Sequence, residues 1–254
     1  MTAAGSFLLD VVGLRKAFGA LVAVDDVSFG LRAGEILGIA GPNGAGKTTL
    51  FNLITGIPFR LDRGTVTLGG TRIDRLSPHH IFRLGLARTF QKETTFAELT
   101  VEQNVRLGAV YGAALRGREL ALRVDATLDR LDLSARRLQP ASSLTVYESK
   151  RLMLASAVVT KPRLLMLDEP ASGLTGAEVA DLQRVILDIR RDGAAILLIE
   201  HILPLLFGLS ERVMVMDFGR KLVEGPPAAV ARDERVIEAY LGGQSQGAAD
   251  ALAG

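Results

Sequence analysis

Short apolar segments alternate with a helical pattern in the second half of the chain. Residues 163–167, which are apolar after Arg163, and the apolar run 194–199 have the length that is typical of strands buried in a sheet. Between them, residues 176–192 have helical periodicity, begin with a capping box and end at Gly193. A strand, a helix and a second strand in this order predict a parallel sheet with right-handed crossovers.

The first part of the chain predicts strands and a short helix, and Ser77-Pro78 is typical of the N-cap and first position of a second helix. Residues 27–31 alternate between apolar and polar positions, and residues 35–40 form another apolar run. A helix over residues 47–55 is expected to end at Gly56, because glycine commonly follows the last helical residue. Residues 64–68 then form a strand that leads into a Gly-Gly hairpin signal.

Residues 95–160 follow a different pattern from the rest. Three helical segments succeed one another there without a convincing strand, and two of them begin with a capping box. We interpret them as a helical subdomain inserted into an α/β core that comprises residues 1–94 and 161–241. Residues 242–254 are small and polar and are expected to be disordered.

Composition excludes several classes of protein. Of the 254 residues, 48% are hydrophobic and 23% are charged, which are values of a globular protein and not of a disordered chain. Cysteine is absent, which excludes disulfides and thiolate metal sites, and the lack of Trp disfavours a base-stacking nucleic-acid binder. No segment approaches the ~18 apolar residues of a membrane span, and we find no signal peptide. We therefore expect a cytoplasmic chain that reaches a membrane only through a partner.

The segment between the apolar run 35–40 and the helix 47–55 has the pattern G-x-x-x-x-G-K-[ST]. Glycines let backbone N–H groups curl around phosphate oxygens, and the following helix N-terminus adds partial positive charge. Lys47 would contact the β- and γ-phosphates, and the Thr48 hydroxyl would bind Mg²⁺. A plain glycine turn with a surface lysine is the alternative, but the flanking strand and helix disfavour it. The motif consists of Gly41, Pro42, Asn43, Gly44, Ala45, Gly46, Lys47 and Thr48.

Three further candidates directly follow buried strands. Asp168 and Glu169 come after the first apolar run of the second half, and His201 comes shortly after the second run. Because parallel strands share their carboxyl edge, we expect all three at the edge where the glycine loop lies. Asp168 can bind Mg²⁺ through water, Glu169 can polarise an attacking water, and His201 can contact the γ-phosphate. The alternatives are a carboxylate that caps a turn and a structural histidine.

Taken in order, the glycine loop, Gln91, the helical insertion, the Asp-Glu motif and His201 resemble the ATP-binding cassette (ABC) ATPases, from about residue 7 to residue 241. The resemblance implies a P-loop NTPase (RecA-like) α/β core with an antiparallel β subdomain and an inserted helical subdomain. Several segments look more narrowly like the ATPase subunits of branched-chain amino acid importers. These segments are residues 18–24, 41–56, 87–91, 198–201 and 238–242.

The resemblance also implies roles for single residues. Phe18 would stack on the adenine ring, although a core phenylalanine at a strand end is the alternative. Thr49 lies in the part of the loop that matches the family. Gln91 would bind Mg²⁺ and sense the γ-phosphate, so the implied cofactors are ATP and Mg²⁺. Lys47, Glu169 and His201 would be the catalytic residues.

The resemblance implies membrane partners. Permease subunits would bind the chain at the inner face of the cell membrane, and a solute-binding protein would be an indirect partner. Near Gln91, we expect the apolar residues Phe96, Leu99, Val101 and Val105 to contribute to a groove for a short permease helix, although some of them must face the chain's own core. A head-to-tail dimer would hold each ATP between one protomer's glycine loop and the other protomer's signature motif, which is normally L-S-G-G-Q.

The signature motif is where this chain departs from the family. The corresponding positions read Leu144, Thr145, Val146, Tyr147 and Glu148. Tyr147 replaces a glycine and adds bulk, and Glu148 replaces a neutral glutamine with a negative charge that is disfavoured beside ATP. The same segment also serves as a helix N-cap, so harmless variation and a weakened site are both open.

Two rival functions remain. The first is a non-transport ABC ATPase of DNA repair or translation, although such proteins usually carry tandem cassettes or long insertions. The second is an ATP-binding module with weak or no hydrolysis alone, which the unusual signature suggests. The sequence leaves open the transported solute and the choice between homodimer and heterodimer.

Overall fold

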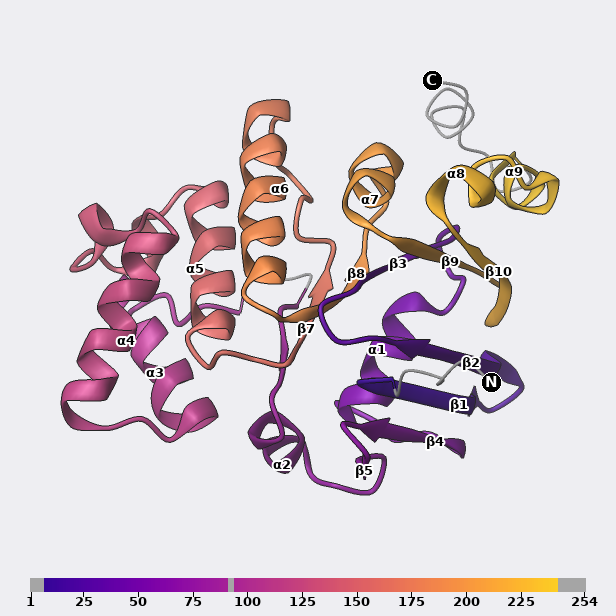
Figure 1. The fold of residues 1–254 in the computed structure, drawn as a ribbon, viewed down its shortest axis with the longest axis horizontal. Coiled ribbons are helices and arrows are strands. Elements are labelled where there is room, and N and C mark those ends of the chain that lie inside the picture. Colours follow the sequence, from indigo (N-terminus) through magenta and orange to yellow (C-terminus); the bar gives the residue numbers. More distant parts are fainter. Residues whose placement is uncertain (1–6, 91–93, 242–254) are drawn as a thin grey trace, which may run out of the picture. The chain divides into compact units, whose positions relative to one another are not determined.

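The computed structural model describes residues 7–90 and 94–241, which form two compact units (Figure 1). Unit 1 combines the chain up to Ile81 with the chain from Ala195 onward, and unit 2 comprises Phe82–Ala194. The helical subdomain that the sequence predicts, residues 95–160, lies within unit 2. Unit 2 also contains the neighbouring residues 82–94 and 161–194.

An antiparallel sheet forms the first layer of unit 1. Its strand order is β2-β1-β4-β5, and each neighbouring pair runs antiparallel. The pairing of β1 with β2 has register shifts, and Gly13 adopts a positive φ of 60° within β1. This sheet is the antiparallel β subdomain that the family resemblance implies. The bounds are β1 (Leu9–Phe18), β2 (Leu21–Leu31), β4 (Arg63–Leu68) and β5 (Thr71–Arg72).

A second group of strands in unit 1 is mainly parallel. Strand β3 pairs in parallel with β8 on one side and with β9 on the other, while β10 pairs antiparallel with β9. All residues of β3 and β8 are buried, which explains why both strands are uninterrupted apolar runs. The bounds are β3 (Ile36–Ala40), β8 (Ala195–Ile199), β9 (Arg212–Asp217) and β10 (Arg220–Gly225).

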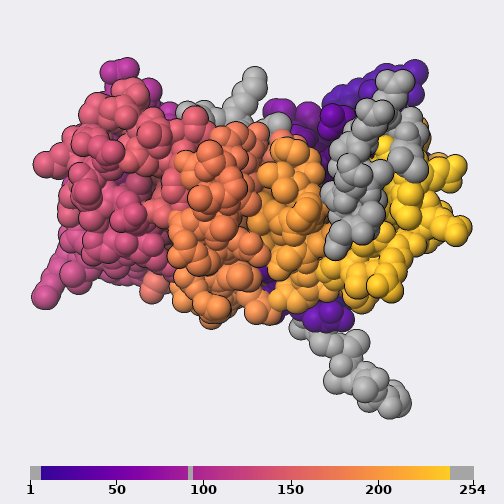
Figure 2. All heavy atoms as spheres, turned by 90° about the horizontal axis from the view of Figure 1, so that it is seen from above, coloured from indigo at the N-terminus to yellow at the C-terminus, as the bar shows by residue number. Residues whose placement is uncertain are grey.

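Unit 1 also contains the helix that follows β3. Helix α1 (Lys47–Thr55) ends at Gly56 in the left-handed conformation, as the sequence predicts. Helix α2 begins at Pro78, and the chain passes along it from unit 1 to unit 2. The residues of α8 and α9 are yellow in Figure 2, where they form part of the surface of this unit. The remaining bounds are α2 (Pro78–Arg83), α7 (Leu203–Leu209), α8 (Pro227–Val230) and α9 (Glu234–Leu241).

The described part of unit 2 combines a pair of parallel strands with the helices α3 to α6. The register of the strands joins Leu86 to Leu164. The three capping boxes that the sequence predicts are formed at the starts of α3, α5 and α6. None of the helices in the described residues is long and apolar enough to cross a membrane. The bounds are β6 (Leu86–Arg88), α3 (Val101–Leu107), a π-helical turn (Gly108–Gly112), α4 (Gly117–Arg130), α5 (Val146–Val158), β7 (Leu164–Asp168) and α6 (Gly176–Arg191).

Candidate nucleotide site

The glycine loop of unit 1 joins β3 to α1, and its glycines are required by geometry. Gly41, Gly44 and Gly46 have φ values of 142°, 82° and 97°. A Cβ on Gly41 would lie 2.2 Å from the carbonyl oxygen of Met216, and a Cβ on Gly46 would lie 2.3 Å from that of Ala23. The loop backbone therefore packs against neighbouring strands in a conformation that only glycine tolerates.

The N-terminus of α1 is open to an anion. Gly46 precedes the helix without a side-chain capping bond, and the first turn contains no acidic residue. The first N–H groups of a helix have no partner within the helix, and the helix dipole gives them partial positive charge. Such an end is well suited to bind phosphate oxygens.

Lys47 completes the loop. Its side chain is largely buried, and its Nζ donates hydrogen bonds to the carbonyl oxygens of Gly41 at 2.6 Å and Pro42 at 2.9 Å. The ammonium group therefore lies folded over the loop. Thr48 is exposed at the start of α1, and Thr49 beside it is half-buried.

Strand pairing brings His201 to the edge at which the loop lies. Ile39 of β3 pairs with Ile199 of β8, so Gly41 and His201 both follow the same end of two neighbouring parallel strands. The His201 side chain is 55% exposed, and its Nδ1 lies 3.9 Å from Oε2 of the buried Glu200. The prediction that His201 shares the sheet edge with the loop is confirmed within unit 1.

Phe18 lies at the end of β1 and is 43% exposed. Its ring packs edge-to-face against Phe59 with a centroid distance of 4.9 Å, and Lys16 Nζ lies 5.4 Å from its centroid. The alternative of a core phenylalanine is excluded by this exposure. An accessible ring at a strand end is available for stacking on another flat group.

In unit 2, Asp168 ends β7 and is almost completely buried. Its Oδ2 accepts a hydrogen bond of 3.0 Å from Nη2 of Arg88, and both side chains are 2% exposed. The Arg88 guanidinium also lies 4.8 Å from the ring centroid of Phe90. Burial lowers the pKa of Arg88, although the Asp168 carboxylate opposes this effect. Sequence reasoning missed Arg88 as a partner of the acidic motif.

Glu169 follows Asp168 in a strained backbone conformation. Its φ is 49°, which is unusual for a residue with a side chain and often marks a functional position. Its carbonyl oxygen accepts a hydrogen bond from Ser172 N at 3.2 Å, which fixes the turn after the strand. Gln91 lies outside the described residues.

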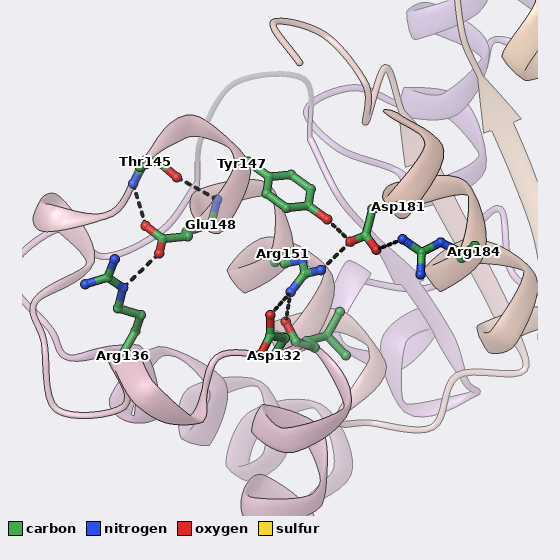
Figure 3. A network of polar contacts seen from close by, with 9 residues as sticks. Asp132, Arg136, Thr145, Tyr147, Glu148, Arg151, Asp181 and Arg184 are labelled. Carbon is green, nitrogen blue, oxygen red and sulfur yellow. Dashed lines mark hydrogen bonds and ion pairs between the residues drawn. The ribbon is translucent and has the colours of Figure 1, made fainter. Parts of the chain in front are cut away.

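The signature segment begins α5 in unit 2, and Figure 3 shows how its polar groups are paired. Thr145 accepts a hydrogen bond from Glu148 N, and a Glu148 carboxylate oxygen accepts one from Thr145 N at 2.9 Å. The other Glu148 oxygen lies 2.8 Å from Nε of Arg136. The bond from Thr145 N and the nearby Arg136 hold the pKa of Glu148 below its ordinary value. Val146, between them, is 50% exposed.

Tyr147 contacts a residue of its own helix, α5, and a residue of α6. Its ring lies 4.7 Å from the Arg151 guanidinium, and its hydroxyl donates a hydrogen bond to Asp181 of α6. Asp181 also pairs with Arg151 and with Arg184 (Figure 3). The hydrogen bond from Tyr147, followed by Arg151, lowers the pKa of Asp181. The tyrosine ring that replaces glycine therefore links α5 to α6.

Oxygen donors suitable for Mg²⁺ are present in both units. The Thr48 hydroxyl and the Asp168 carboxylate are hard ligands of the type that Mg²⁺ takes together with substrate phosphates. Within the part of the chain that the structure describes, no three acidic or histidine side chains form a cluster that could hold a metal without other ligands. Within unit 1, the exposed Thr48 hydroxyl beside the glycine loop fits an ion that is bound together with phosphate groups.

A groove with a volume of about 230 Å³ lies in unit 2. It is lined by residues 87–90 and 94–96, by α3 with its π-helical turn, and by α5. Phe96 is 61% exposed beside it, whereas Val101 and Val105 are fully buried. The two valines are thus the members of the expected set that face the core of unit 2, while Leu99 is half-buried.

The glycine loop defines a phosphate-binding site of the P-loop type, between a buried strand and a helix. The model of the family described as "ABC transporter" matches residues 24–172, and that of "Branched-chain amino acid ATP-binding cassette transporter" matches residues 220–245. The chain belongs to the ABC transporter family, as an ATP-binding protein that hydrolyses ATP.

Individual relatives agree with this assignment. The high-affinity branched-chain amino acid transport ATP-binding protein LivG of Salmonella typhimurium is 40% identical over 92% of this chain and 98% of its own length. BraF of Pseudomonas aeruginosa, with the same description, is 35% identical with the same coverage. The solved structure of MJ1267, an ATP-binding cassette of an ABC transporter, has a TM-score of 0.85 and 28% identity and covers 92% of this chain and 99% of that one.

Proposed function

We propose that this chain is the ATP-hydrolysing subunit of an importer for branched-chain or related amino acids. The observation that carries the proposal is the open glycine loop with Lys47 folded over it. The match of residues 220–245 to a branched-chain family model and the similarity to LivG and BraF support this class of solute. Transport then places the chain in the cytoplasm, at the inner face of the membrane.

In this proposal, hydrolysis depends on positioning and on stabilising charge. Lys47 and the loop N–H groups hold the β- and γ-phosphates, and Phe18 stacks on the adenine. Glu169 orients the attacking water, and His201 stabilises charge on the γ-phosphate. Bound Mg²⁺ would neutralise charge on the phosphate oxygens, and Thr48, Asp168 and Gln91 would hold it.

The groove in unit 2 is our candidate site for a permease segment. Its lining includes the exposed Phe96 and residues 87–90, which directly precede Gln91 in the sequence. A short amphipathic helix can bury its apolar face in such a groove. The contact would connect the membrane subunit to the segment that carries Gln91. A solute-binding protein would act on the chain only indirectly, through the permeases.

The signature segment favours an asymmetric assembly. In a head-to-tail dimer, residues 145–148 would face the ATP that the partner subunit holds. Here the Glu148 carboxylate caps the helix end and pairs with Arg136, so a negative charge lies at the start of the helix that would face this ATP. This pairing also favours the second candidate, a module that hydrolyses ATP slowly alone. A heterodimer with a cassette of ordinary signature would restore one efficient site.

The test of the proposed function separates binding from turnover. Glu169→Gln should retain the Mg-ATP affinity of the unaltered protein in titration calorimetry and lose phosphate release. Phosphate release that persists in Glu169→Gln would contradict the role of this residue.

A second experiment tests the partner. Co-expression with the permease subunits of a branched-chain amino acid importer should move the chain to the membrane fraction and support leucine uptake into vesicles. Membrane association without any permease would contradict the docking proposal. Uptake of a different solute would contradict the solute class alone.

A further inference from the structure

Tyr240, near the end of α9, contacts the phosphate loop from a distant part of the sequence. Its hydroxyl oxygen accepts a hydrogen bond of 2.8 Å from the backbone N–H of Gly41, the first residue of the loop. The two residues are 199 positions apart in the chain. Burial is the main cause that raises the pKa of Tyr240, so the hydroxyl is neutral at physiological pH.

Gly41 is held through both of its backbone polar groups. Its N–H donates to Tyr240, while its carbonyl oxygen accepts the 2.6 Å hydrogen bond from Lys47 Nζ. Its φ of 142° and the nearby Met216 carbonyl leave no room for a side chain. The loop thus begins at Gly41, whose unusual conformation is fixed by two side chains. Tyr240 bonds to its N–H group, and Lys47 bonds to its carbonyl oxygen.

We expect Lys47 and Tyr240 to respond differently when a phosphate binds. An ammonium group that moves to a phosphate weakens its bonds to the carbonyl oxygens of Gly41 and Pro42. Tyr240 has no such competing role, because its hydroxyl bonds to the N–H of Gly41 and not to an oxygen of the loop. Its bond can remain in both states and keep the start of the loop in place.

We propose that Tyr240 is a positioning residue for the phosphate loop, and that α9 thereby controls nucleotide affinity. The proposal rests on nucleotide binding at this loop. A preorganised site binds its ligand more tightly because less conformational freedom is lost on binding. Loss of the hydroxyl allows the Gly41 peptide to move in the empty protein, and binding must then order it again.

Helix α9 is suited to this role because it is anchored independently of the loop. Val236 on this helix is 1% exposed, so a buried side chain holds the helix in unit 1 in addition to the Tyr240 contact. A cavity of about 610 Å³ lies beside the contact, lined by residues 42–45 and by α9 residues that include Glu238 and Ala239. The loop and this helix therefore do not pack closely at the cavity. The Tyr240 hydrogen bond is a direct contact that joins them beside it.

The test compares Tyr240→Phe with Glu234→Gln, a control at an exposed position of the same helix. One net hydrogen bond is worth about 0.5–1.5 kcal/mol, which corresponds to roughly a twofold to twelvefold change. We expect Tyr240→Phe to weaken ATP and ADP binding by this factor in calorimetry. KM should rise with kcat unchanged, because the loop holds ground state and transition state alike. The control should match the unaltered protein.

A second measurement needs no nucleotide. Hydrogen exchange of the Gly41 amide, followed by NMR in the empty protein, should accelerate in Tyr240→Phe and not in the control. Unchanged exchange and unchanged affinity in a variant that keeps its melting temperature would overturn the proposal. A lower melting temperature with unaltered nucleotide affinity would also overturn it, since Tyr240 would then be only structural. If the unaltered protein binds no ATP, the proposed function fails, whereas the exchange experiment still tests the role of Tyr240.

Discussion

Two helix N-termini of this chain illustrate opposite uses of the same element. Helix α1 in unit 1 follows Gly46 in the left-handed conformation, has no side-chain capping bond and lacks an acidic residue in its first turn. Helix α5 in unit 2 begins with Thr145 and Glu148, which bond to each other's backbone N–H groups. Arg136 then pairs with the same carboxylate. One end is open to an external anion, and the other is closed by an internal one.

The difference shows that a few residues decide what a helix end can bind. Free N–H groups and the dipole are present at every helix N-terminus, so neither makes a phosphate site by itself. Glycines with a positive φ and an adjacent Lys47 leave α1 open and add positive charge. A capping box stabilises α5 as a helix, but it places the chain's own Glu148 carboxylate at the N-terminus of this helix.

The largest effect is expected from a substitution at Gly46, the residue that precedes the open N-terminus of α1. Gly46→Ala places a Cβ 2.3 Å from the Ala23 carbonyl oxygen, whereas a Cβ on Gly44 meets no atom within 4 Å. Both positions have a positive φ, which costs about 1–2 kcal/mol for alanine. The clash should add about 1–3 kcal/mol to Gly46→Ala alone. Urea unfolding of the two variants measures this difference, and equal losses of stability would mean that the loop adapts.

Next in size is the loss of the positive charge at the open end. Lys47→Ala removes charge-assisted hydrogen bonds to phosphate, each worth about 1.5–3 kcal/mol, so ATP affinity should fall at least roughly tenfold. Lys161→Ala serves as the control, because Lys161 is exposed in unit 2, outside the loop. Calorimetry that gives one ATP affinity for both variants would contradict the assignment of the loop.

Much of this comparison was predictable from the sequence. The glycine motif, the start of α1 at Lys47 and its end at Gly56 are local features that short-range patterns encode. The capping boxes of α3, α5 and α6 are equally local, and all three formed as predicted. Strand β1 was not predicted, because its apolar and polar residues do not alternate cleanly and its pairing with β2 has shifts in register.

The long-range contacts of the site were not predictable. The bond from Gly41 to Tyr240 joins residues 199 positions apart, and the pair Arg88–Asp168 joins residues 80 positions apart. Nothing in the local pattern around Arg88 or Tyr240 states which partner the fold supplies. Glu148 was predicted as a charge unfavourable beside ATP, but its pairing with Arg136 depends on how the chain before α5 folds back.

A smaller effect is expected from opening the closed end. Tyr147→Gly together with Glu148→Gln restores residues that the ordinary signature carries and removes the carboxylate. If this charge opposes the partner's ATP by about 1 kcal/mol at a partly exposed site, the ATPase rate of the chain alone should rise roughly fivefold. Glu148→Gln alone retains the cap of Thr145 and so separates charge from bulk. An unchanged rate, in a variant shown to dimerise with ATP, would mean that the substitutions are harmless.

The smallest expected effect concerns the bonds that hold the closed end in place. Asp181 accepts the Tyr147 hydroxyl and pairs with Arg151, and these contacts lower its pKa below the ordinary 3.8. A carboxyl whose pKa is lowered by folding stabilises the protein fully above its unfolded pKa of about 3.9, and this contribution is lost as pH falls through the lower folded value.

Asp181→Asn should therefore lower the free energy of unfolding by about 1 kcal/mol at pH 7, since the side chain is 22% exposed. The difference from the unaltered protein should begin to shrink only below about pH 4, and it should vanish as the pH falls through the lowered pKa of Asp181. Asp132→Asn is the matched control, because Asp132 pairs with the same Arg151 but is 90% exposed. Urea unfolding between pH 2 and pH 7 measures both variants. A constant difference across this range would show that the carboxylate charge of Asp181 does not hold Tyr147 and the start of α5 against α6.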